Sequence, residues 1–196
     1  MNYKDDDSFF TTVFPPFVYY GWNVKSWLLE NENAKYRYIR DYEIEQEFWN
    51  VEQINEVYEG IKTIAIVVNP WARTYYVYQQ LLEMKNNNDN RLIDINQLEL
   101  ENFTKFVESL PSFPSEIGNF WFSLTTPVCK WADNADYILK DTSMQEDFRP
   151  IQDYFLSNDK LNVLETIDYQ DFYNDKTKKI VATIFKEDIE QFGYIF

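Results

Sequence analysis

The sequence predicts an α/β protein with a mainly parallel sheet, because short apolar runs alternate with amphipathic segments along the chain. Residues 62–83 show this best: the apolar, β-branched run 63–68 is followed by Asn69, Pro70 and a helical segment. Such a run is typical of a strand covered on both faces. Asparagine is a good N-cap, and proline fits the first helical turn. A second inner strand is expected at residues 136–140.

Three more helices are predicted from residues that favour helix N-termini. Asn102 and Asn174 are predicted to be N-caps, because apolar residues at helical spacing follow each of them. Ser143 and Glu146 have the spacing of a capping box. Pro150 should then kink or reset the helix that follows Ser143, since proline lacks an N–H group.

The last helix is expected to be long, with apolar positions from Ile180 to Ile189. Gly193 should end it, and Tyr194 and Phe196 should pack back against the fold. Two further helices are expected at residues 21–30 and 50–59, and further strands at residues 9–20, 35–41 and 91–95.

Length and composition predict a single domain at residues 9–196 after a polar tail at residues 1–8. With 45% hydrophobic and 19% aromatic residues, the composition excludes a disordered chain. The 18 basic and 33 acidic residues give a net charge of −15. We therefore expect neither nucleic acid, whose phosphates need a basic face, nor an anionic membrane surface as a partner. The clearest basic cluster falls on the surface of the last helix, at Lys176, Lys178 and Lys179.

The residue types narrow the chemistry that is open to the chain. It has no histidine, which is the commonest general base and metal ligand. We therefore assign no metal ligand and no catalytic residue. The one cysteine, Cys129, is expected in the core, because a nucleophilic cysteine would need a histidine partner. The acidic N-terminus has no signal-peptide core, and no apolar run approaches a membrane span.

Three motifs, together with the order of the elements, make the chain resemble the PAPS-dependent sulfotransferase family; PAPS is the phosphoadenosine phosphosulfate donor. Residues 69–73, Asn-Pro-Trp-Ala-Arg, are similar to the family's R-N-P-x-x-R turn after an apolar strand. Residues 137–148 are similar to its I-L-R-x-E-x-L-x-x-D-F motif, and residues 172–194 to its closing helix with D-x-x-x-F-G-Y. The resemblance implies a sulfotransferase-like, three-layer P-loop fold, with a mainly parallel central sheet flanked by helices.

The chain departs from the family where the donor would bind. The family's P-K-T-G-G-T-S loop corresponds to residues 17–23, where only Gly21 matches and bulky Tyr20 and Trp22 replace small residues. The family's arginine before Asn-Pro is Val68 here, and a conserved family serine is Tyr76. Losing these contacts to a donor with roughly four negative charges removes about 5 kcal/mol of binding free energy, since each charged hydrogen bond contributes about 1.5–3 kcal/mol.

The resemblance and its departures predict a non-catalytic sulfotransferase-like protein, similar to small members in marine bacteria and their phages. It would need no cofactor and would act through a protein partner or assembly, a phage virion being one concrete version. It would then be cytoplasmic or virion-associated. The alternative is an active sulfotransferase acting on a hydroxyl of a sugar or small molecule. Its PAPS site would use Gly21, Asn23, Lys25, Asn69 and Arg73.

A third alternative is a neutral nucleotide or sugar stacked between Trp22 and Trp71. An active transferase would also need a base to deprotonate its acceptor. Glu30 and Glu43 are the nearest carboxylates after the first expected helix, and we interpret both as solvated surface residues.

Overall fold

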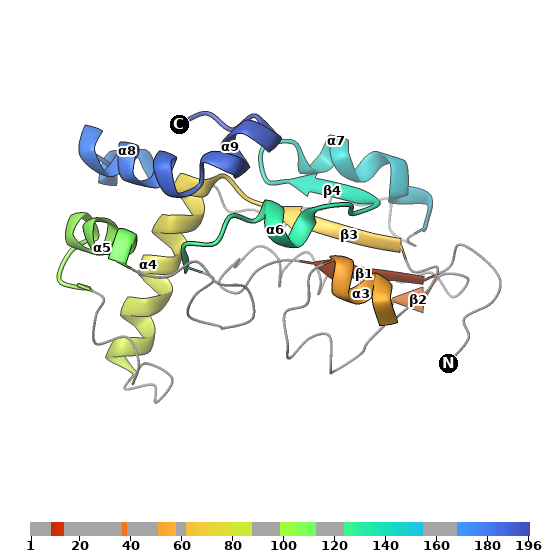
Figure 1. Cartoon of the computed structure of the whole chain (residues 1–196), viewed down its shortest axis with the longest axis horizontal. Helices are drawn as coiled ribbons and strands as arrows, with labels where there is room; N and C mark the ends of the chain where they lie inside the picture. Colours follow the sequence, from red (N-terminus) through yellow and green to blue (C-terminus); the bar gives the residue numbers. More distant parts are fainter. Residues whose placement is uncertain are drawn as a thin grey trace. The chain divides into compact units, whose positions relative to one another are not determined.

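The computed structural model describes residues 9–13, 37–38, 51–57, 62–87, 99–112, 124–154 and 168–196 (Figure 1). These residues fall into two compact units, which we describe separately. The sheet unit contains β1 (Phe9–Val13), β2 (Arg37–Tyr38), α3 (Val51–Val57), β3 (Lys62–Val67), α6 (Cys129–Ala132), β4 (Tyr137–Lys140), α7 (Met144–Phe148) and the 3-10 helix η4 (Arg149–Tyr154). The helical unit contains α4 (Pro70–Asn86), α5 (Phe103–Ser109), η2 (Leu110–Ser112), η5 (Gln170–Phe172), α8 (Asp175–Ile184) and α9 (Lys186–Phe192).

The sheet is parallel, as the alternation of apolar and amphipathic segments predicts. β3 pairs with β4 from Ile64 opposite Tyr137 to Val67 opposite Lys140. The backbones of β1 and β2 extend the sheet in the order β2-β1-β3-β4, with every pair parallel. The occurrence of helices with parallel strands confirms the mixed helix-and-strand class.

The central strand β3 has the burial that its apolar sequence predicts, since every residue from Thr63 to Val67 is fully buried. Asp136, just before β4, ties the two strands together. Its carboxylate accepts hydrogen bonds from the Thr63 N–H at 2.9 Å and from the Thr63 hydroxyl at 3.1 Å. The Lys62 ammonium lies 3.1 Å from the same carboxylate. These contacts hold the start of β4 against the start of β3.

Two short helices complete the core of the sheet unit. Val51 and Ile54 on α3 pack with Trp131 on α6, and all three side chains are buried. Cys129, at the start of α6, is buried as expected.

The capping box predicted at Ser143 is wrong. Ser143 precedes α7 but makes no side-chain cap hydrogen bond to the helix. Its hydroxyl donates instead to Asp147 at 2.8 Å, and the same carboxylate oxygen accepts the Lys140 N–H at 2.9 Å. Asp147 therefore joins the end of β4 to α7, a role that the Ser143–Glu146 spacing does not indicate. The reset at Pro150 is confirmed, because α7 ends at Phe148 and the chain continues as η4.

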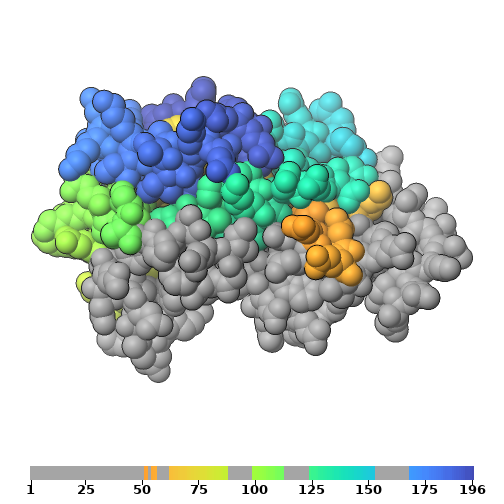
Figure 2. All heavy atoms as spheres, in the orientation of Figure 1, coloured from red at the N-terminus to blue at the C-terminus, as the bar shows by residue number. Residues whose placement is uncertain are grey.

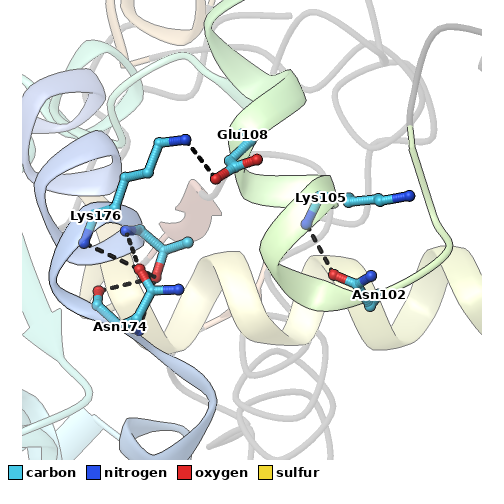
Figure 3. Close-up of polar contacts among 6 residues, drawn as sticks. Asn102, Lys105, Glu108, Asn174 and Lys176 are labelled. Atoms are coloured by element: carbon cyan, nitrogen blue, oxygen red, sulfur yellow. Dashed lines mark hydrogen bonds and ion pairs between the residues drawn. The ribbon is translucent and has the colours of Figure 1, made fainter.

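In the helical unit, aromatic side chains join α4 to α5. Phe103 lies 5.5 Å from Tyr75 and 5.4 Å from Tyr78, and Phe106 lies 5.4 Å from Tyr78, each between ring centroids. Asn102 caps α5 as predicted, with its side-chain oxygen accepting the Lys105 N–H at 3.0 Å (Figure 3). The predicted apolar face of α5 is thus confirmed as the face that packs on α4.

Asn174 caps α8 with a reciprocal capping box. Its side-chain oxygen accepts the N–H groups of Lys176 and Thr177, and the Thr177 hydroxyl accepts the Asn174 N–H at 3.0 Å (Figure 3). An ion pair of 2.6 Å between Lys176 and Glu108 links α8 to α5. Figure 2 shows α5 and α8 side by side on one face of the helical unit.

The single long helix predicted after Asn174 is wrong, because it breaks at Phe185. There the backbone takes φ −104° and ψ 30°, and α9 begins at Lys186. The buried positions Thr177, Val181, Phe185 and Asp188 continue across the break, so the helical spacing in the sequence does not reveal it. Gly193 ends α9 in the left-handed conformation with φ 72°, as predicted.

The expected helix at residues 21–30 and the expected strand at residues 91–95 lie outside the described residues. In the part of the chain that the structure describes, no helix has the length and apolar character needed to cross a bilayer.

Candidate functional site

The candidate site is the first turn of α4, which the chain enters from β3 through Val68 and Asn69. Asn69 is only 4% exposed. Its side-chain oxygen accepts the Trp71 N–H at 3.0 Å, and its backbone oxygen accepts the Arg73 N–H at 2.8 Å. The side-chain amide donates to the Ile195 carbonyl at 3.0 Å. Asn69 thus caps α4, as predicted, and also holds a segment from the end of the described chain.

Trp71 is enclosed by residues near α8 and by the last residues of the chain, and is 6% exposed. Its indole N–H donates to the Lys178 carbonyl at 3.2 Å, and its backbone oxygen accepts the Tyr173 hydroxyl at 2.8 Å. The Phe196 ring lies edge-on to the indole, with centroids 5.5 Å apart. Phe196 therefore covers the side chain that follows the Asn69-Pro70 turn.

A lysine side chain also packs against the Phe196 ring. The Lys178 ammonium sits 3.7 Å from the centroid of the Phe196 ring, within the range of a cation–π contact. The rings of Tyr169 and Tyr173 lie edge-on to Phe196 at 6.0 and 5.4 Å. Phe196 is thus held between one cation and three aromatic rings.

Arg73 points into the helical unit and is only 2% exposed. Its Nη1 donates to the Thr126 carbonyl at 2.9 Å, and its guanidinium lies 5.2 Å from the centroid of the Phe185 ring. Burial lowers the pKa of Arg73 from 12.5 to about 10, and the charge of Asp188 opposes this shift. This net shift corresponds to about 3 kcal/mol against the charged form, with the attraction of Asp188 already included.

The positions that differ from the sulfotransferase motif are also buried. Val68 and Tyr76 are 1% and 7% exposed, and the Thr74 hydroxyl donates to the Pro70 carbonyl at 2.8 Å. The first turn of α4 is therefore a packed, internally hydrogen-bonded turn. Its side-chain groups are directed at the chain itself.

The structure brings together two of the five residues named for a donor site, Asn69 and Arg73, at the start of α4. The other three, Gly21, Asn23 and Lys25, lie outside the described residues, as do Trp22, Glu30 and Glu43.

Of the predicted basic cluster, Lys176 and Lys179 are exposed on α8. Among the described residues, no group of three or more potential ligands could hold a metal ion.

Sequence reasoning missed three residues that surround this turn: Tyr173, Thr126 and Asp188. Tyr173 and Asp188 lie inside the closing motif at residues 172–194, which marks the segment but not its contacts. Thr126 accepts the Arg73 bond with its backbone carbonyl, a group that every residue has, so the residue type gives no signal of this contact. The packing of Tyr194 and Phe196 against the fold is confirmed, since Tyr194 is buried and Phe196 contacts Trp71.

Comparisons of this chain with protein-family models, with curated proteins and with solved structures give no match.

Proposed function

We propose that the chain is a sulfotransferase-like protein with a degenerate donor site, and that it acts as a structural or interaction protein rather than as an enzyme. The observation that supports this most is the bond from the Asn69 amide to the Ile195 carbonyl, at 3.0 Å. A helix N-terminus after a strand is a common place for a phosphate. Here the cap residue is engaged with the chain itself, and Phe196 covers the adjacent Trp71.

The charges near this turn support the same proposal. Tight binding of a polyphosphate needs cations that face the ligand. The guanidinium of Arg73 is buried against Thr126 and Phe185, and Val68 occupies the position of the family's other arginine. A donor would therefore lose about 5 kcal/mol of charged hydrogen bonding relative to the family's site.

The proposal includes a three-layer arrangement around a mainly parallel sheet. Two observations favour it: the parallel pairing of β3 with β4, and the order of strand, Asn69-Pro70 turn and helix. In this proposal the protein works within a larger assembly, specifically as a component of a phage virion. The competing function is sulfate transfer from PAPS to a hydroxyl of a sugar or small molecule.

Calorimetry tests the degenerate site directly. PAP and PAPS are titrated into the full chain at low salt, where phosphate contacts are strongest. We expect no binding heat at millimolar ligand. A micromolar Kd would overturn the proposal in favour of an active donor site. The variants Arg73→Ala and Lys25→Ala would then identify the cation responsible, with exposed Arg149→Ala as the matched control.

Sedimentation of a native extract tests the role in an assembly. We expect the chain to sediment with a particle or a larger complex, and to leave it when the salt concentration or denaturant is raised. A chain that sediments as a free monomer at every concentration would argue against a structural role, whatever calorimetry shows.

A further inference from the structure

The most exposed large apolar side chain among the described residues belongs to Ile195, which is 82% exposed. Its backbone is held in place, because the Ile195 carbonyl accepts the Asn69 amide at 3.0 Å. Phe196, the next residue, packs edge-on against Trp71 and remains half-buried. A single exposed apolar side chain is common on protein surfaces. The charges that lie beside these two residues therefore decide what they can bind.

Two neighbouring lysines of α8 form no ion pair with a described residue. Lys178 places its ammonium 3.7 Å from the centroid of the Phe196 ring, and Lys179 follows it with its side chain exposed. The ion pairs between described residues use other lysines, namely Lys62, Lys105, Lys176 and Lys186. Acidic residues outnumber basic ones by 33 to 18 in this chain, so acidic partners for lysine are plentiful. The charges of Lys178 and Lys179 are thus available to a partner beside an exposed apolar side chain.

We infer that a second copy of this chain docks, through an acidic region, on the surface formed by Lys178, Lys179, Ile195 and Phe196. We call this the Lys178 surface. Charge complementarity selects the occupant, because α8 carries three lysines and one aspartate whereas the whole chain has a net charge of −15. The rest of each copy is acidic on balance and offers the charge that the two lysines attract. The inference rests on the proposed structural role, and it names copies of the chain as the units of the assembly.

The sign of the charge also determines the kind of contact. In a two-fold dimer the same surface meets itself, so the lysines of the two copies would face one another. Like charges placed against each other disfavour a contact. A head-to-tail contact, in which the Lys178 surface of one copy meets an acidic region of the next, avoids this repulsion. Contacts of this kind pass from copy to copy and build rings or filaments, as a structural protein requires.

Analytical ultracentrifugation of the purified full chain tests self-association directly. We expect the mean mass to rise with protein concentration beyond the mass of a dimer at about 20 mM salt. At about 0.5 M salt the association constant should fall at least roughly tenfold, because salt screens the attraction between exposed charges. A chain that stays monomeric at both salt concentrations would overturn the inference, as would an association that stops at the dimer.

Two charge reversals locate the contact. Lys179→Glu changes the Lys178 surface, whereas Lys85→Glu makes the same change of net charge at an exposed lysine in the last turn of α4. We expect Lys179→Glu to lower the association constant at least about tenfold, and Lys85→Glu to stay within about threefold of the parent chain. Ile195→Asp should resemble Lys179→Glu, because it removes the apolar side chain and adds a charge that repels an acidic partner. Equal effects of the two lysine reversals would overturn the inference.

A mixing experiment separates head-to-tail contacts from two-fold contacts. A Lys179→Glu copy keeps its acidic region, so it binds the Lys178 surface of a parent copy but offers only a weakened surface to the next one. Adding this variant to the parent chain should therefore end the growth of assemblies and lower their mean mass. Parent assemblies whose mass does not change when the variant is added would overturn the head-to-tail contact.

The outcomes for this surface are distinct from those for the proposed function. A purified chain that stays monomeric, while a native extract still contains it in a large complex, would overturn the second copy as occupant and leave the structural role in place. Micromolar binding of PAPS would instead overturn the degenerate donor site. It would not alter the self-association that ultracentrifugation measures, which would still support the inference.

Discussion

The side-chain amide of Asn69 donates a hydrogen bond of 3.0 Å to the carbonyl oxygen of Ile195, across 126 residues of sequence. The oxygen of the same side chain accepts the Trp71 N–H and caps α4. One side chain therefore serves both a local helix start and a long-range contact. A residue with only an acceptor cannot replace it.

Asn69 substitutions should separate these two roles. Asn69→Ser keeps a capping oxygen but cannot reach Ile195, so we expect a loss of about 1 kcal/mol in the free energy of unfolding. Asn69→Ala loses both contacts and should lose about 2 kcal/mol. Urea unfolding measures both losses. Asn102→Ala, which removes a helix cap alone, is the control and should resemble Asn69→Ser. An Asn69→Ser variant as stable as the parent chain would contradict the long-range role, and equal losses for Asn69→Ser and Asn69→Ala would contradict the capping role.

A double-mutant cycle should reveal the coupling of Arg73 and Asp188, whose opposite charges are both buried. Arg73→Met leaves the Asp188 carboxylate in the interior without this cation, so we expect a loss of about 3 kcal/mol. Adding Asp188→Asn removes the stranded charge and should recover at least about 1 kcal/mol.

Arg149→Met is the matched control for this cycle, because Arg149 is exposed and its loss should change stability by less than about 0.5 kcal/mol. Chemical denaturation gives the four free energies. Strictly additive losses at positions 73 and 188 would mean that the two charges do not interact.

Local sequence signals predicted the helix starts well. Asn69, Asn102 and Asn174 each cap a helix, because the N-cap preference depends on a side chain and N–H groups two or three residues away. The signal failed at Ser143, where Asp147 accepts its hydroxyl, and at Phe185, where the helix breaks within an unbroken apolar pattern. At both residues the local sequence pattern fits the predicted structure, but the folded chain adopts a different hydrogen bond or backbone conformation there.

The contacts around the candidate site were less predictable, because several of them are made to backbone carbonyls far away in the sequence. Arg73 bonds to a carbonyl 53 residues away, and Trp71 to one 107 residues away. A backbone carbonyl is available at every residue, so nothing in the sequence marks these two. The closing segment was predictable only as far as Gly193 and its aromatic neighbours, whose types indicate a turn and a packing role.

Asp136 should contribute more to stability than its ion pair suggests. Asp136→Ala removes the acceptor for the N–H and hydroxyl of buried Thr63, so we expect a loss of about 2 kcal/mol. Lys62→Ala removes the partly exposed ion pair but leaves the contacts between Asp136 and Thr63, so it should cost less than about 0.5 kcal/mol. Thermal or urea unfolding compares the two. A loss for Lys62→Ala as large as for Asp136→Ala would show that the ion pair, rather than the Thr63 contacts, holds β4.

Tyr173 should make the chain sensitive to alkaline pH. Burial raises its pKa well above 10.0, so the folded state keeps the phenol neutral after the unfolded state has begun to ionise. The contribution of this pKa shift to the free energy of unfolding is complete below about pH 10. It declines as the pH rises toward the folded-state pKa, by up to about 1.4 kcal/mol per pH unit.

Tyr173→Phe provides the comparison. At about pH 8 the parent chain should be more stable by about 1 kcal/mol, because the variant lacks the bond to the Trp71 carbonyl. By about pH 11 that advantage should shrink or reverse, which urea unfolding at both pH values measures. Parallel pH profiles for the two proteins would contradict the raised pKa.

Among the described residues, the three helices with side-chain caps all use asparagine, which has a consequence at acidic pH. An aspartate cap stabilises its helix as a carboxylate and weakens when it is protonated, whereas an amide has no proton to gain. The chain carries 33 acidic residues, and acid neutralises their mutual repulsion. The starts of α4, α5 and α8 therefore stay capped as acidification removes the negative charge around them.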